Sequence, residues 1–500
     1  MDDANGTPDG DASSEPGLGG RLPEPVDIAR TGDIILDVTL ENSKDTLRSA
    51  KRAQPKVRLT GQELPPLARA RLRLAFRVEL GVLRKQSKYF EKLLSDVRFQ
   101  EAKDIADAFA ALSVKNVEPG AADAKDLPWI KIHDDDEATH YAHRDGAFAD
   151  LLRILHGQAA ITKQITMPFV TTLAVLADRF DCTVAVSKYV QTGLKFKWPV
   201  TSRKPVRDET PTMSRNNENV LRQKILVSWL LNQPVKFQSA TRELIMNGST
   251  QWSSFGAEEG DEDVDGAGTS TTATWWYLQD GLEPELQYRR HCVLNTVASV
   301  QRHFLARYAS RNARQCRLGY DSSVACDSYQ LGEMFKFLTH KGLLSPVDFS
   351  PASLDGIADA ALLPIDALLA TLRQCPSYQI DKNHSNCGLR TKILPILDFL
   401  QGLLSANSVP LSRQAWKNNR QAAAWMPTDG GEADGAKGQD EDRVFRFTRA
   451  LAGDARLRFE NQMGAEKFAR DVFTATSWDW SAEDQAPEQR ISTAPKLSWK

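Results

Sequence analysis

Three cysteines and one histidine in the second half of the chain have the residue types of a zinc site. Cys316 and Cys326 form a C-x9-C pair, and His384 and Cys387 come much later as H-x2-C. Three thiolates and one imidazole would complete a tetrahedral zinc shell, and four protein ligands would make such an ion structural. The alternative is a set of buried cysteines with a surface histidine, because free cysteine is among the most buried residue types. The sequence leaves both interpretations open.

A second polar cluster contains His133, Asp134–Asp136, His140 and His143, which are residue types of a metal or acid–base site. Because the cluster follows the end of an expected strand, we interpret it as a solvated turn. Cys182 ends an apolar helix and is interpreted as a core residue. The sequence lacks a phosphate loop, a nucleophile elbow, a dinucleotide fingerprint and an H-E-x-x-H zinc motif. We therefore expect neither an enzyme nor a small-molecule substrate.

The polar cluster and Cys182 lie in the first half of the chain, whose strands and helices would position them. Apolar alternation predicts strands at 34–40 and 72–80, which form a hairpin split by an insertion, and a third strand from Trp129. Helical spacing predicts helices at 81–96, 146–157, 167–182 and 184–196, with a long polar insert at 101–126. His156 lies near one helix end, where a cation would complement the helix dipole.

Beyond the proline-containing stretch 199–211, the strand signals largely stop and the chain is predicted to be helical. The expected helices cover 219–231, 286–308, 330–342, 357–372 and 393–404. After Ser405 the sequence becomes polar and irregular, with short amphipathic islands. The acidic stretches 256–268 and 429–442 contain too few apolar residues to offset the entropy of ordering, so both predict mobile loops.

Length and composition describe a water-soluble chain of two or three domains, with 500 residues, 41% hydrophobic residues and a net charge of −2. No apolar run is long enough for a membrane span, and six cysteines are too few for a disulfide scaffold. We expect a cytoplasmic or nuclear protein without a membrane partner. The expected organisation is a disordered lead 1–30, a first domain 31–190 with insertions near 41–70 and 101–127, a linker 191–217, a helical domain 218–405 with an acidic loop 256–270, and a largely disordered tail 406–500.

The first domain contains a distinctive series of motifs. They are the Asp37-Val38 strand, FRVE (76–79) and LRKQSKYFEKLLSDVRFQE (83–101), followed by Asp134–Asp136, LLRILHG (151–157) and LAVLADRFDC (173–182). With these motifs, residues 33–187 resemble the BTB/POZ domain of fungal-type proteins. Stretches of the helical half, such as 228–247 and 326–344, are also similar to the region after the domain in those proteins.

This resemblance implies an α+β fold, in which a small three-stranded sheet is capped by helices and followed by a mostly helical domain. It also implies homodimerisation through the first helix and the N-terminal segment, and a cullin scaffold of ubiquitin ligases as a partner. The family-derived core or interface residues are Asp37, Phe76, Glu79, Leu83, Ser87, Tyr89, Phe90 and Leu94. Glu79 departs from the pattern, because many members have histidine at that position. This departure counts against partners that bind the pocket near the family's aspartate and histidine, and it leaves the fold unaffected.

We therefore expect a non-catalytic protein-interaction protein, with BTB-mediated dimerisation and a role as substrate adaptor of a cullin-type ubiquitin ligase. The alternative is a nuclear regulatory scaffold or transcription-associated BTB protein. Its basis is the basic run between Lys44 and Arg77, which holds ten lysines and arginines against Asp45 and Glu63. A solvated loop is favoured over a nucleic-acid contact there, because aromatic residues for base stacking are absent until Phe76.

Overall fold

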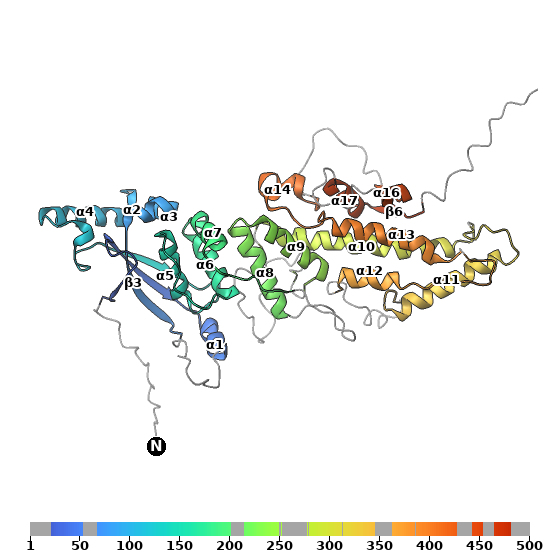
Figure 1. Ribbon diagram of the computed structural model, residues 1–500, viewed down its shortest axis with the longest axis horizontal. Helices are drawn as coiled ribbons and strands as arrows, with labels where there is room; N and C mark the ends of the chain where they lie inside the picture. The colour runs from blue at the N-terminus through green and yellow to red at the C-terminus, as the bar shows by residue number, and fades with distance from the viewer. Residues whose placement is uncertain are drawn as a thin grey trace, which may run out of the picture. The chain divides into compact units, whose positions relative to one another are not determined.

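A computed structural model describes residues 22–53, 68–201, 215–249, 252, 278, 280–312, 314–345, 363–385, 387–427, 443–453 and 465–481. The chain divides after Lys195 into two compact units, which we call the N-terminal unit and the C-terminal unit. Figure 1 shows the elements of both units, which combine a small sheet with a majority of helices, as the expected α+β class requires. The expected acidic loops 256–270 and 429–442 lie outside the described residues.

The N-terminal unit is built on a four-stranded sheet in the order β1-β3-β2-β4. Its strands are β1 (Pro25–Asp27), β2 (Ile34–Glu41), β3 (Arg71–Val78) and β4 (Trp129–Asp134). Strands β2 and β3 are antiparallel, with Ile34 opposite Val78, so the expected hairpin is confirmed. Strands β1 and β4 run parallel to β3 and β2, respectively. Strand β2 is buried from Ile34 to Leu40, which indicates that both faces of the sheet are covered.

Helices cover this sheet on its two faces. Residues alternate between faces along a strand, so Ala75 and Phe76 point in opposite directions. Ala75 packs in a cluster with Leu112 of α4 (Gln100–Val114). Phe76 lies against Phe148 of α5 (Arg144–Leu155), with ring centroids 5.8 Å apart. Helices α6 (Met167–Arg179) and α7 (Thr183–Thr192) pack against α5 and complete the helical layer.

Three expectations for this unit need correction. Strand β1 lies inside the expected disordered lead, of which residues 1–21 fall outside the described part. The insertion near 41–70 contains helix α1 (Lys44–Ala53), and residues 54–67 are not described. The insertion near 101–127 contains α4, whose Phe109 and Leu112 belong to a cluster with sheet residues. A polar composition concealed α1, because only a narrow stripe of a surface helix needs to be apolar.

The single helix expected at 81–96 is two helices, α2 (Leu80–Gln86) and α3 (Lys88–Ser95). The break falls at Ser87, whose backbone is extended with φ −136° and ψ 120°. The buried Ser87 hydroxyl oxygen accepts a hydrogen bond from the Phe90 backbone N–H (3.0 Å) and donates one to the Phe180 carbonyl (2.6 Å). One side chain therefore caps α3 and ties it to the end of α6.

The C-terminal unit is organised around α10 (Leu282–Ala309), which lies beside α13 (Leu389–Ser405) in Figure 1. Helices α9 (Pro234–Asn247) and α11 (Ser323–His340) also pack against α10. The remaining helices that sequence periodicity predicted are α8 (Arg215–Leu230) and α12 (Ile365–Arg373). Helix α9 was not among the predicted elements. No helix in the described part of the chain is long and apolar enough to cross a bilayer.

The sequence predicts a largely disordered tail after residue 405 with short amphipathic helices, and the part of this tail that the structure describes is folded more extensively than that. This part contains α14 (Arg413–Asn418), α15 (Arg420–Ala423), β5 (Val444–Arg446), α16 (Arg449–Gly453), α17 (Ala465–Phe473) and β6 (Ser477–Asp479). Trp416, Trp425 and Trp480 are buried in the same core as α10 and α13. Strands β5 and β6 form a parallel pair, so the second half is not purely helical. Isolated aromatic anchors between polar residues leave little periodic signal, although each buries a large area.

A buried arginine joins α8 to α10 within this core. The Arg222 guanidinium donates to Glu218 and to Glu283, each at 3.1 Å, and to the Ser249 hydroxyl at 2.9 Å. The side chains of Arg222 and Glu218 are fully buried. Burial of these charges is tolerated because each finds a partner of opposite charge.

Candidate metal centre

Three separate segments of the C-terminal unit bring the four predicted ligands together. Cys316 lies on the loop between α10 and α11, and Cys326 lies in the first turns of α11. His384 and Cys387 lie on the loop between α12 and α13. Their ligand atoms all lie within 4.8 Å of one another, so this set could hold a metal ion. The sequence interpretation selected the same four residues.

The distances among three of the ligand atoms are compatible with one tetrahedral ion. The Cys316 sulfur lies 3.4 Å from His384 Nδ1 and 3.6 Å from the Cys387 sulfur, and the Cys387 sulfur lies 3.6 Å from Nδ1. Zinc bond lengths place two sulfurs of a tetrahedral site about 3.8 Å apart, and sulfur and nitrogen about 3.5 Å apart. These three distances are close to the zinc values, and the Cys326 sulfur lies within 4.8 Å of the other ligand atoms.

Burial decides against the alternative of a surface histidine. His384 and Cys326 are each 0% exposed, and Cys316 is 5% exposed, while Cys387 is half-buried. All six cysteines are free thiols, so a disulfide does not explain the approach of the three sulfurs. A buried imidazole surrounded by thiols needs hydrogen-bond partners or a bound cation to offset the loss of water.

Hydrogen bonds around the centre orient the ligands. His384 Nε2 lies 2.9 Å from the Ser322 hydroxyl, which accepts the Nε2 proton when Nδ1 faces the sulfurs as a ligand. The Asp327 carboxylate accepts bonds from the backbone N–H groups of Gln315 (2.8 Å) and Cys316 (2.9 Å). The loop that carries Cys316 is thus anchored on α11 without a contribution from the ion.

The thiols themselves resist joint ionisation. Burial, together with the neighbouring thiols, raises the pKa of Cys326 to about 12, and burial also raises the pKa of Cys387. Burial opposes ionisation of Cys316 as well, but hydrogen bonds to its sulfur outweigh this effect and lower its pKa. Three thiolates this close repel one another, so a cation is the natural counter-charge.

The chain matches no family model, no curated protein and no solved structure.

Six of the eight family-derived residues are core residues. The buried ones are Asp37, Phe76, Leu83, Ser87, Phe90 and Leu94. Tyr89 is 38% exposed, and Glu79 is half-buried. Both acidic members have partners within the chain: the Arg73 guanidinium donates to both Asp37 carboxylate oxygens (2.8 and 2.6 Å), and the Thr31 hydroxyl donates to Glu79 (2.7 Å).

His156 is the C-cap residue of α5, so its expected place at a helix end is confirmed. Its Nε2 accepts a hydrogen bond from the Glu79 backbone N–H (3.1 Å). Its Nδ1 lies 2.7 Å from the Leu152 carbonyl. The ring therefore links the end of α5 to the start of α2.

The polar cluster at the end of β4 is a solvated turn only in part: His133 and Asp135 are exposed, and His140 and His143 are half-buried, but two of its carboxylates are not solvated. Asp134 and Asp136 are buried, and Asp134 forms ion pairs with Arg144 and Arg179. Burial raises the pKa of Asp134 in spite of these two arginines. Asp136 accepts bonds from the backbone and the hydroxyl of Ser43, each at 2.9 Å. The two carboxylates therefore connect the end of β4 and the segment after it to Arg144, Arg179 and Ser43.

The basic run from Lys44 to Arg77 also makes structural contacts. Arg73 is paired with Asp37, and Arg77 donates to the carbonyl oxygens of Gly32 (2.9 Å) and Ala122 (3.0 Å). These two side chains therefore stabilise the sheet instead of forming an open cationic loop.

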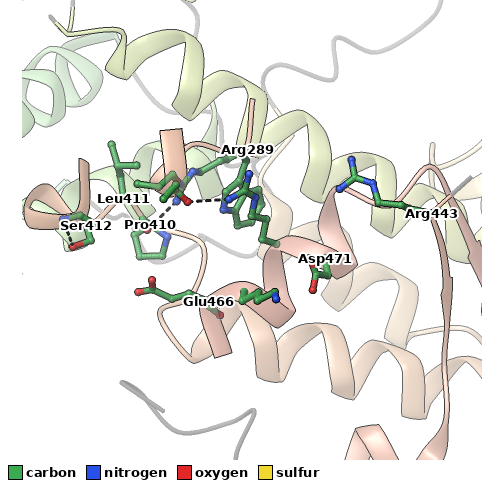
Figure 2. Close-up of a pocket in the computed structure, with 14 residues that line it drawn as sticks. Arg289, Pro410, Leu411, Ser412, Arg443, Glu466 and Asp471 are labelled. Carbon is green, nitrogen blue, oxygen red and sulfur yellow. Dashed lines mark hydrogen bonds between the residues drawn. The ribbon is translucent and has the colours of Figure 1, made fainter. Parts of the chain in front are cut away.

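A cavity of about 500 Å³ lies between α10, α17 and the segment that follows α13 (Figure 2). In it, Arg289 donates to Glu285 (2.7 Å) and to the Pro410 carbonyl (3.1 Å), and stacks on Trp425 at 4.8 Å. The carboxylates of Glu466 and Asp471 also line the cavity, so charges of both signs face it. We interpret Arg289 as a structural link within the unit.

Proposed function

We propose that this chain is a non-catalytic protein-interaction protein whose N-terminal unit is a BTB/POZ-type dimerisation domain. The supporting observation is the strand order β3-β2-β4, with an antiparallel hairpin followed by a parallel strand and a helix pair divided at Ser87. The sequence resemblance implies a small three-stranded sheet capped by helices, and this arrangement is compatible with it. Strand β1 adds a fourth strand beside β3.

Exposed apolar side chains on α3 and the segment after it support an interface in this unit. Tyr89, Val97 and Phe99 are 38%, 72% and 42% exposed. Large aromatic side chains of this kind are typical anchors of protein interfaces, and two-fold homodimers are the commonest oligomers. The resemblance implies a dimer formed through the first helix and the N-terminal segment, and we expect this surface on and after α3 to take part in it.

The oligomeric state tests the proposal directly. Light scattering after size exclusion should give a dimer for the full chain at micromolar concentration, and a monomer for the double variant Val97→Asp with Phe99→Asp. Val114→Asp is the matched control, because Val114 is 85% exposed at the end of α4. A wild-type monomer would contradict the dimerisation proposal.

The finer proposal is a substrate adaptor of a cullin-type ubiquitin ligase. Asp37 is already paired with Arg73, and Glu79 stands where many BTB members have histidine. A transcriptional regulator that binds an open pocket at these positions would find the Asp37 carboxylate already occupied by Arg73. This occupancy favours the adaptor over the transcription-associated alternative. Capture of a cullin by the full chain, but not by a chain with disrupted dimerisation, supports the adaptor. Salt-sensitive DNA binding that Arg69→Gln and Arg71→Gln abolish would support the alternative.

We further propose that the cluster of Cys316, Cys326, His384 and Cys387 binds zinc as a structural ion. The ion would supply the positive charge that lets the thiols ionise, and four protein ligands would leave no position for a reacting water. Metal analysis should find one zinc per chain in the wild type, and none in Cys316→Ala or Cys387→Ala. Cys292→Ala is the control, because Cys292 is buried elsewhere in the same unit. Metal-free wild-type protein of unchanged stability would refute the zinc proposal.

A further inference from the structure

A second cavity, of about 270 Å³, lies directly beside the metal centre. It is lined by Arg307, Gln315, Arg317, Leu318, Asn383, Ser385, Cys387 and Lys392. Three of these side chains are cationic, and none of the described lining residues is acidic. The cavity therefore concentrates positive charge with hydrogen-bonding groups, which is the chemistry that recognises an anion.

The metal ligands and the cavity residues alternate along the same two loops. Cys316 faces the metal centre while Gln315 and Arg317 line the cavity. On the second loop, His384 faces the centre while its two neighbours, Asn383 and Ser385, line the cavity. One ion that holds the two loops together would therefore also set the spacing of the groups that line the cavity.

Several contacts preorganise this cavity. The Arg307 Nε donates to the Gln315 side-chain oxygen at 2.9 Å, which restricts the guanidinium. Lys392 lies in the first turn of α13, where the helix dipole adds positive potential. The Tyr308 hydroxyl donates to the Cys387 carbonyl at 3.3 Å and so joins α10 to the second loop.

We propose that this cavity binds a phosphate group and that the ion in the metal centre assembles it. The metal-dependent part rests on the zinc proposal above. The volume of about 270 Å³ lies below the range of roughly 300–1,000 Å³ typical of whole drug-sized ligands, so it suits one phosphate with a small substituent. The source is either a small phosphate ester or the phosphorylated side chain of a protein, since the two share this chemistry.

Calorimetric titration of the zinc-loaded full chain tests the site. The probes are inorganic phosphate, a phosphoserine peptide and the same peptide without phosphate. Arg317→Gln with Lys392→Gln should weaken phosphate binding by roughly tenfold or more, with zinc content unchanged, because two charge-assisted contacts are lost. Lys382→Gln is the matched control, since Lys382 lies on the same loop outside the cavity lining and should bind as the wild type does.

The outcomes separate the two proposals. Zinc-loaded protein that binds no phosphate probe overturns the phosphate site and leaves the zinc proposal intact. Phosphate binding that persists after zinc removal, or in a chain that contains no zinc, overturns assembly by the metal. A duplex oligonucleotide is the final arm: if it binds and neither phosphate probe competes with it, the cationic surface is a nucleic-acid contact and the pocket proposal is wrong. A preference for the phosphorylated peptide over inorganic phosphate supports a protein source.

Discussion

Replacement of Ser87 by alanine should destabilise the N-terminal unit far more than removal of an exposed hydroxyl would. The Ser87 oxygen makes two hydrogen bonds in the core, one from the Phe90 backbone N–H at 3.0 Å and one to the Phe180 carbonyl at 2.6 Å. Alanine removes both bonds and leaves the buried Phe180 carbonyl without this donor. It also removes the residue that ends α2 and starts α3.

The expected magnitude follows from these two losses. Removal of an N-cap serine costs about 1 kcal/mol. A buried carbonyl left without its donor costs about 1–3 kcal/mol more. The free energy of unfolding of the unit should therefore fall by about 2–4 kcal/mol in Ser87→Ala, which multiplies its unfolded fraction by roughly thirty to several hundred.

Native-state hydrogen exchange of the full chain measures this change, because the slowest amides of β2 report the opening of the N-terminal unit. Thr166→Ala is the matched control: Thr166 caps α6 from an exposed position, accepting a bond from the Phe169 N–H at 3.4 Å. This control should cost about 1 kcal/mol or less. If Ser87→Ala is no more harmful than Thr166→Ala, the buried hydroxyl does not hold α3 and α6 together.

Three further predictions concern charge and burial. Arg222→Met should destabilise the C-terminal unit by about 3–5 kcal/mol in denaturant unfolding, because two glutamates lose a buried partner; Lys336→Met, in an exposed ion pair, should cost at most about 1 kcal/mol. Burial raises the pKa of Cys182 to about 12, so Cys182 should resist alkylation at pH 8 until the protein is unfolded, as mass spectrometry would show. Hydrogen bonds from Arg98 lower the pKa of Asp96 to about 2. The stabilising effect of these hydrogen bonds is therefore present above the ordinary carboxyl pKa of 3.8 and is lost as the pH falls towards 2. An NMR titration of the Asp96 carboxyl that is the same in the wild type and in Arg98→Ala would contradict this prediction.

Sequence patterns predicted the elements whose signal is local. The hairpin of β2 and β3 follows from alternating apolar residues, and α10 and α13 follow from helical spacing. The break at Ser87 could not be predicted in this way, because it depends on the carbonyl of Phe180, 93 positions along the chain. The tail after residue 405 was misjudged for a similar reason: Trp425 and Trp480 are isolated in the sequence and become core residues only against α10 and α13.

The residue types and spacings of the chain by themselves determined its mixed α+β character and the identity of the four candidate metal ligands. They did not determine whether those ligands meet, because Cys316 and His384 are 68 positions apart and spacing alone does not fix the loops that carry them. The tertiary structure decided this by burying His384 and by holding the Cys316 loop on Asp327 of α11. It also buried Asp134, which belongs to the expected solvated turn, in ion pairs, since Arg144 and Arg179 reach Asp134 only once α5 and α6 have packed.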